Sequence, residues 1–222
     1  MLRDAAVIAA KDLRVEWRSR VITNQIAPFT LLIVVLFGFA LDAQTQTLRD
    51  TAAGLFWVAV LLVALLAVQR GAAIETADDA QQRLLLSPVD PASVFLGKAA
   101  ALAVQLLALE VLLSAAVLVL YDVSVGDPLL MVAAAVVATV GIAAAGTLYG
   151  VLAVGLGVRE TLLPILLLPV LAPVLISATR SFGDAFDRVD ADGWAWFGLL
   201  GAFAVIYIVF GLLAYGVLLE ES

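Results

Sequence analysis

The sequence predicts an all-α integral membrane protein with six transmembrane helices, and two properties of the chain carry this prediction. Of its 222 residues, 64% are hydrophobic and 14% are charged, whereas soluble domains average about 45–50% and about 25%. Six apolar stretches approach the roughly 20 residues that a spanning helix needs. A water-soluble fold of this size could not cover so much apolar surface, so residues 1–222 are expected to form a single transmembrane domain.

The expected spans cover residues 21–41, 52–69, 99–121, 128–157, 161–178 and 194–219. The fourth is too long to cross the bilayer upright, and its five glycines predict a tilted or broken helix. Val158, Arg159 and Glu160 predict a tight turn before the fifth span, because two charges at mid-membrane would be costly. Trp194 and Trp196, where the sixth span begins, are typical of the aromatic belt at a membrane surface.

Lysine and arginine in short loops predict the orientation, because cytoplasmic loops carry an excess of both. With the N-terminus inside, nine basic residues fall on the cytoplasmic side and three on the outer side. Both termini are therefore expected in the cytoplasm, with the chain in the inner or plasma membrane of the cell. The nine are Arg3, Lys11, Arg14, Arg18, Arg20, Arg70, Arg83, Lys98 and Arg159, and the three are Arg49, Arg180 and Arg188.

Residues 4–20 predict an amphipathic helix that lies in the membrane interface. Its apolar residues recur at spacings of three and four, which places them on one helical face. They are Ala6, Ala10, Leu13, Trp17 and Val21. Lys11, Arg14 and Arg18 lie beside that face, where they can reach lipid headgroups. This helix is either a membrane anchor alone or an elbow that also touches a cytosolic partner.

Residues 70–98 form the longest hydrophilic stretch, and the charge pattern places it in the cytoplasm. The sequence predicts a short helix that ends before Ser87-Pro88, and then a second helix with Asp90 as N-cap and Pro91 in its first position. The stretch is either a solvated connector or a docking surface through which a soluble protein pushes on the spans. That surface would consist of Glu75, Asp78, Asp79, Leu84, Leu85, Leu86, Ser87 and Pro88.

Glu110 is the one acidic residue deep within a predicted span, and an intramembrane carboxylate is a functional-site candidate. It predicts either a proton-transfer group or a protonated or hydrogen-bonded group that faces the bundle or a dimer contact. Pro164, Pro169 and Pro173 in the fifth span predict a kinked helix. The kink is either a packing distortion or a flexible gate.

Several kinds of chemistry are excluded by composition. The chain has no cysteine and no histidine, so it can form no disulfide and can use no imidazole or thiolate as catalyst or metal ligand. It contains no G-x-x-x-x-G-K-[ST] motif for nucleotide phosphates. We therefore expect no enzyme activity, no metal site and no cofactor held by this chain itself. The net charge of −7 argues against a nucleic-acid partner.

Several segments are similar to those of one known family. They are the basic and acidic run 11–20, the span 29–40, the run 54–58, and the proline-rich stretch that begins at Leu163-Pro164. The inner loop is the most specific of them, with Arg70, Glu75, Leu84 to Pro88, and Gly97-Lys98. Together they resemble the CcmB family, the membrane subunit of an ABC-type haem exporter complex for cytochrome c maturation. One departure is Asp79-Ala80, where the family often has Asp-Gly.

The resemblance implies a six-span permease of the ABC-2 exporter type that works as a homodimer with two copies of a separate cytosolic ATPase. ATP would bind to that partner. The resemblance also implies a haem-handling membrane subunit and a haem chaperone as further partners, besides membrane lipid, with haem as the transported or handled ligand. It leaves open whether haem passes through this chain or the chain only transmits ATP-driven motion.

Two other functions fit the same residues. An ABC-2-type permease for a lipid, a polysaccharide or a drug would share the topology and the need for an ATPase. A proton-coupled secondary carrier would use Glu110 and would need no ATPase. An integral membrane enzyme is the weakest alternative, because the sequence offers no catalytic set.

Overall fold

The computed structural model describes residues 1–20, 22–41, 45–77, 89–155, 159–187 and 192–221, and no strand occurs within these ranges. The expected all-α class is confirmed. The helices are α1 (Leu2–Ser19), the π-helical turn η1 (Ile22–Ile26), α2 (Ala27–Ala40), α3 (Thr45–Ala77), α5 (Pro91–Leu120), α6 (Pro128–Gly155), α7 (Arg159–Ala185) and α8 (Gly193–Glu221).

Five helices in the described part of the chain are long and apolar enough to cross a membrane: α3, α5, α6, α7 and α8. A sixth span results if α1 and the segment Asn24–Ala40, which meet at 54°, count as one broken span. Helix α2 has 14 residues, which at 1.5 Å each extend only about 21 Å against a hydrocarbon core of about 30 Å. Helix α2, which occupies most of the first predicted span, is therefore too short to cross the membrane by itself, and η1 precedes it directly.

Helix α6 lies at the centre of the bundle and packs against α3, α5, α7 and α8, while α2 lies at one edge against α3 and α5. The α6 face toward its neighbours carries small side chains, with Ala134, Ala138 and Ala145 fully buried. Small residues let helix backbones approach closely. The resulting van der Waals contacts hold the helices together in lipid, where no hydrophobic driving force acts between them. Gly146 belongs to this face, because a Cβ there would lie 2.7 Å from Val68 of α3.

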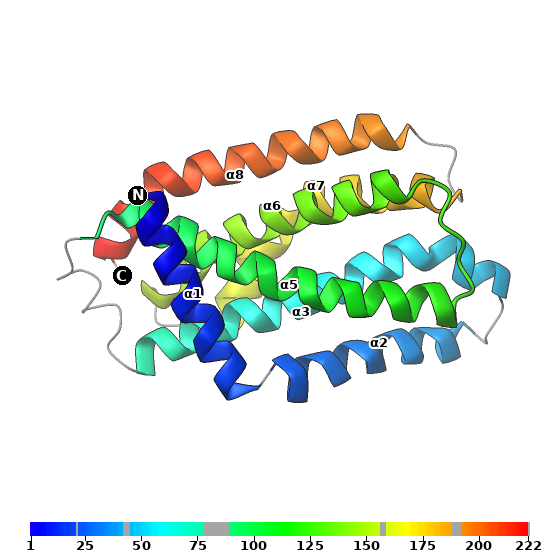
Figure 1. Cartoon of the computed structure of the whole chain (residues 1–222), viewed down its shortest axis with the longest axis horizontal. Coiled ribbons are helices and arrows are strands. Elements are labelled where there is room, and N and C mark those ends of the chain that lie inside the picture. The colour runs from blue at the N-terminus through cyan, green and yellow to red at the C-terminus, as the bar shows by residue number, and fades with distance from the viewer. Residues whose placement is uncertain (21, 42–44, 78–88, 156–158, 188–191, 222) are drawn as a thin grey trace.

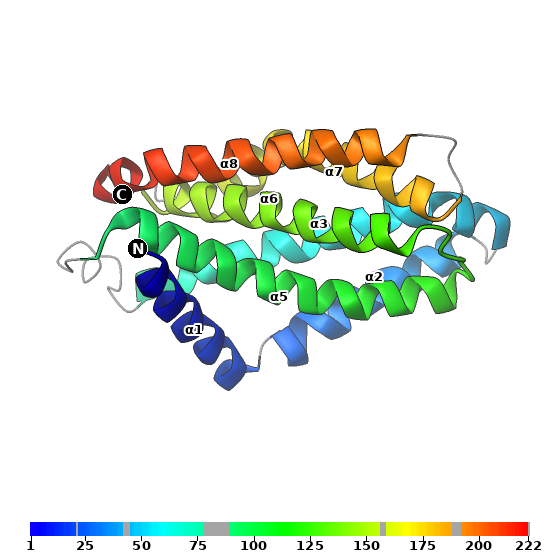
Figure 2. The same ribbon diagram turned by 45° about the horizontal axis from the view of Figure 1, so that its top comes forward.

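Both termini lie at the same end of the bundle, where α1 crosses α5 obliquely (Figures 1 and 2). We call this the terminal end, and we call the other end, where α2 ends and α3 begins, the opposite end. Helix α3 ends at the terminal end with Ala77, and α5 starts there with Pro91.

Several predicted boundaries were wrong. Helix α3 continues to Ala77, so Arg70 is helical and does not open a loop; its charge is tolerated there because it pairs with α1. Arg159 and Glu160 form the first turn of α7 and so do not belong to a turn before that helix, and Val158 lies outside the described residues. Helix α6 is unbroken from Pro128 to Gly155 despite its glycines.

Helix α7 is likewise continuous from Arg159 to Ala185 with Pro164, Pro169 and Pro173 inside it, so the fifth segment is not a broken helix. Proline removes a backbone donor, but in a bilayer no water competes for the remaining helix bonds, and helices persist across it. The gate function of these prolines stays a prediction.

Candidate functional site

The first contact at the terminal end joins the start of α1 to the start of α5. Ala5 is buried against α5, and a Cβ added at Gly97 would lie 2.7 Å from the Ala5 carbonyl oxygen and 2.7 Å from Ile8 Cβ. Only glycine allows this approach, because the neighbouring atom at Ala5 is backbone and cannot rotate away. Next to Gly97, Lys98 is buried to 9% exposure, which fits a helix start covered by α1.

The second contact joins the end of α1 to α3. Arg70 Nη2 donates a hydrogen bond to Ser19 Oγ at 3.0 Å, and Arg70 Nε lies 3.4 Å from Glu16 Oε2. Both charged side chains are largely covered, so this ion pair is less screened than one at a free surface. Helix α1 is thus attached to α5 at one end and to α3 at the other.

Helix α1 presents the predicted apolar and basic residues away from the bundle. Trp17 is 86% exposed, and Ala6, Ala10, Lys11, Arg14 and Arg18 are exposed too. Of the predicted stripe, Ala6, Ala10 and Trp17 are therefore free for lipid, Leu13 is partly buried, and Val21 lies outside the described residues. Sequence analysis missed a further face of the helix, with Ala5 and Ile8, which contacts α5 at Gly97. The spacing of these residues was the available signal, but small apolar residues do not show whether they face protein or lipid.

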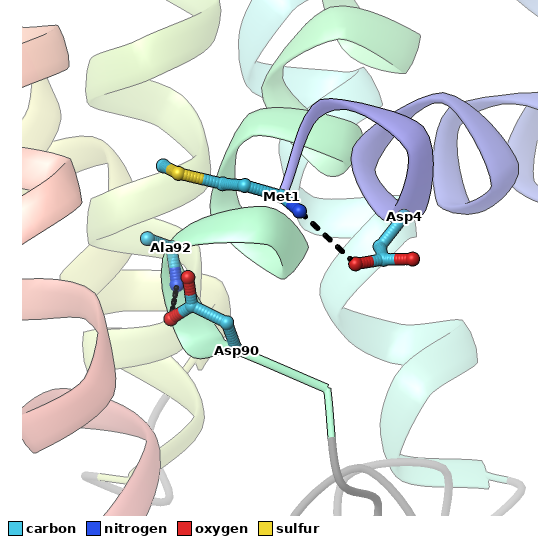
Figure 3. Close-up of polar contacts among 4 residues, drawn as sticks. All are labelled: Met1, Asp4, Asp90 and Ala92. Atoms are coloured by element: carbon cyan, nitrogen blue, oxygen red, sulfur yellow. Dashed lines mark hydrogen bonds and ion pairs between the residues drawn. The ribbon is translucent and has the colours of Figure 1, made fainter.

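The start of α5 agrees with the sequence prediction. Asp90 is the N-cap, its Oδ1 accepts a hydrogen bond from Ala92 N at 3.2 Å, and Pro91 follows in the first helical position. Figure 3 shows this cap beside the start of α1, where the Met1 amino group pairs with Asp4 at 3.2 Å. The cap fixes where the chain enters α5 from the preceding segment.

The predicted docking residues are only partly within the described structure. Glu75 lies in the last turns of α3, and Asp78, Asp79, Leu84, Leu85, Leu86, Ser87 and Pro88 lie outside the described residues. The two helices that bound this segment are described, and α1 contacts both of them. The terminal end, where α1 contacts both the last part of α3 and the first turns of α5, is therefore the candidate functional site.

Glu110 faces the interior of the bundle and is 4% exposed. Its Oε1 lies 2.5 Å from Thr139 Oγ1 of α6, and the same hydroxyl lies 2.7 Å from the Ala135 carbonyl oxygen. A hydroxyl carries one proton, so both contacts are hydrogen bonds only when the carboxyl is protonated and donates to Thr139. Glu110 Oε2 has no hydrogen-bond partner among the described residues. The geometry thus favours a neutral, bundle-facing carboxyl that joins α5 to α6.

Long apolar helices packed around a central α6 define the class of this molecule, which is a multi-pass helical membrane protein. Comparison with protein families narrows the class, because residues 3–222 match the family described as CcmB protein. The chain belongs to the CcmB family.

Individual relatives agree with the family match. The chain is 29% identical over 188 residues to Heme exporter protein B of Rhodobacter capsulatus, covering 85% of this chain and 84% of that one. It is 27% identical over 222 residues to the protein of the same name from Pseudomonas aeruginosa, covering 94% of each. A shorter match, 35% identical over 88 residues, is to Heme exporter protein B of Escherichia coli K12 and covers 39% of this chain and 40% of that one.

Proposed function

We propose that this chain is the permease subunit of an ABC-type complex that exports or handles haem during cytochrome c maturation. The observation that carries the proposal is the family match along residues 3–222, together with relatives named Heme exporter protein B that align over most of their length. Hydrolysis of ATP belongs to a separate cytosolic subunit, because the sequence has no phosphate-binding motif of its own. A second copy of the chain, a haem-handling membrane subunit and a haem chaperone complete the set of partners.

The segment from Glu75 to Pro88 is the element that docks on the ATPase in this proposal. Its leucines fill an apolar groove and its acidic residues meet basic ones at the rim. The support comes from the two ends of the segment, since α1 contacts α3 through Arg70 and α5 through Gly97. A push transmitted by the segment would therefore reach α3, α5 and α1 together.

The orientation in this proposal places the terminal end in the cytoplasm, as the nine basic residues against three indicate. Because the chain has no cysteine, single cysteines can report it. A membrane-impermeant maleimide should label Ser124→Cys, which is exposed between α5 and α6, in intact cells. It should label Ser222→Cys only after lysis. Labelling of Ser222→Cys in intact cells would reverse the orientation.

The function is tested in cells whose own copy of the gene has been deleted. Re-supplied wild-type chain should restore c-type cytochromes and should co-purify with an ATPase. Changing Leu84, Leu85 and Leu86 together to Asp should abolish both, because interfaces depend on a few buried anchors, while the rim variant Asp78→Asn should change little.

The outcomes of this experiment separate the alternatives. Unchanged cytochromes in the deletion strain, with an ATPase still bound to the re-supplied chain, would indicate an ABC-2-type permease for another substrate. Normal ATPase binding and normal cytochromes in the triple Asp variant would show that the segment is a solvated connector. Staining for c-type cytochromes and the amount of chain in the membrane are measured in the same cells.

A further inference from the structure

A groove of about 370 Å³ lies between α3 and α7, toward the opposite end of the bundle. Gly54 of α3 faces Thr179 of α7 there, and a Cβ on Gly54 would make an ordinary van der Waals contact with the Thr179 side chain at 4.0 Å. Trp57 forms the floor; it is 1% exposed and packs edge-on against Phe182 with the ring centres 5.1 Å apart. The walls are apolar and open to the surroundings, with Val58 43% and Ile176 54% exposed.

Arg180 is the one charged residue that lines this groove. It lies five residues before the end of α7 at Ala185, or about 7.5 Å along the helix axis, near the end of a helix that is long and apolar enough to cross a membrane. The Arg180 side chain is exposed, and none of the ion pairs between described residues involves it. The groove thus combines a cation near the end of a candidate membrane span with an apolar surface that continues toward the middle of that span.

We propose that this groove is a binding site for an anionic membrane lipid, with the lipid phosphate on Arg180 and one acyl chain along Val58 and Ile176. The guanidinium is a two-pronged donor that matches phosphate oxygens. The volume of about 370 Å³ is within the range of ligand pockets, roughly 300–1,000 Å³. A second copy of the chain is a poorer occupant, because it would bury an unpaired guanidinium, which is costly at a low-dielectric contact.

Trp57 provides a direct readout of the acyl chain. In a variant with Trp17, Trp194 and Trp196 changed to Phe, Trp57 is the remaining tryptophan. We expect its fluorescence to be quenched by phosphatidylglycerol with brominated acyl chains at about fivefold lower mole fraction than by brominated phosphatidylcholine, the preference that one basic residue gives near a membrane surface. Arg180→Gln should remove this preference, and Arg180→Lys should keep it.

A matched control keeps Trp194 alone, with Trp57 changed to Phe. Trp194 is 45% exposed at the start of α8 and does not line the groove, so both lipids should quench it equally. Equal quenching of Trp57 by both lipids, unchanged in Arg180→Gln, would overturn the proposal, since it describes ordinary lipid contact. Failure of either lipid to quench Trp57, with Ile176→Cys forming a disulfide-linked dimer, would overturn it in favour of a second copy.

Discussion

Glu110→Lys is expected to remove most of the folded protein from the membrane, whereas Glu110→Gln is expected to leave it near the wild-type amount. Lysine places a fixed charge at the middle of α5, where Glu110 is 4% exposed, and a charge at a helix centre costs about 2.5–3.5 kcal/mol on insertion scales. Glutamine keeps the size and supplies an amide donor for Thr139 Oγ1, 2.5 Å from Oε1 in the present contact. Its cost should be below about 1 kcal/mol, the typical worth of a hydrogen bond between membrane helices.

The measurement is the amount of monodisperse protein in mild detergent and its thermal unfolding midpoint, followed with a fluorescent fusion. Thr139→Val is the matched partner variant: if the two groups bind each other, Glu110→Gln and Thr139→Val should not be additive. The amount of c-type cytochromes in the same cells distinguishes a structural role of Glu110 from a proton-transfer role. Normal amounts of Glu110→Gln protein with cytochromes lost as fully as in Glu110→Lys would show a proton-transfer role, and the secondary-carrier function would then gain.

The second large effect is expected at Gly97. Gly97→Leu should detach α1 from α5, because even the first atom of the new side chain would lie 2.7 Å from the Ala5 carbonyl oxygen. Overpacking of this kind costs about 1–3 kcal/mol when the structure can shift. Gly97→Ala should already be destabilising. Gly71→Ala is the matched control near the same end of the bundle, since a Cβ there meets nothing within 4 Å and alanine favours helix by about 1 kcal/mol over glycine.

The change to alanine is therefore expected to lower the thermal unfolding midpoint of the purified chain at Gly97 and to raise it at Gly71. Trypsin cleavage after Lys11 and Arg14 gives a second readout, because α1 should be cut faster once it leaves α5. Equal midpoints and equal cleavage of Gly97→Ala and Gly71→Ala would mean that α1 and α5 do not make this contact.

The sequence was sufficient where local chemistry decides the structure. Asp90 and Pro91 were predicted as the start of α5, and they are, because an N-cap and a first-turn proline act within four residues. The apolar runs located all the long helices, because length and hydropathy are properties of each segment alone. The exceptions were helix ends that extend into polar sequence: α3 runs from Thr45 to Ala77 where 52–69 was predicted, and α7 continues to Ala185, past the predicted end at 178. The polar residues after Gln69 predicted a loop, because Ser19, which accepts the hydrogen bond of Arg70, lies 51 residues earlier in the chain.

The candidate site was less predictable, because its geometry depends on contacts between distant segments. Nothing near Glu110 in the sequence indicates Thr139, which lies 29 residues away on α6. Nothing near Gly97 indicates that Ala5 and Ile8 will pack on it. The groove beside Arg180 is formed by residues 54–61 of α3 and residues 175–180 of α7, which are far apart in the sequence. The residue type at each of these positions can mark it as a candidate, but its contact partner becomes known only from the packed structure.

The two attachments of α1 also constrain how the protein is made. Ala5 is synthesised first, but its contact at Gly97 is 92 residues further along the chain, which a ribosome needs roughly 5 to 20 s to produce. During that interval α1 lacks the α5 surface on which Ala5 packs. The exposed Trp17, with Lys11 and Arg14 beside it, allows α1 to bind the surface of the bilayer until α5 has been made. The face that stays exposed in the finished bundle is thus the one that the nascent chain needs first.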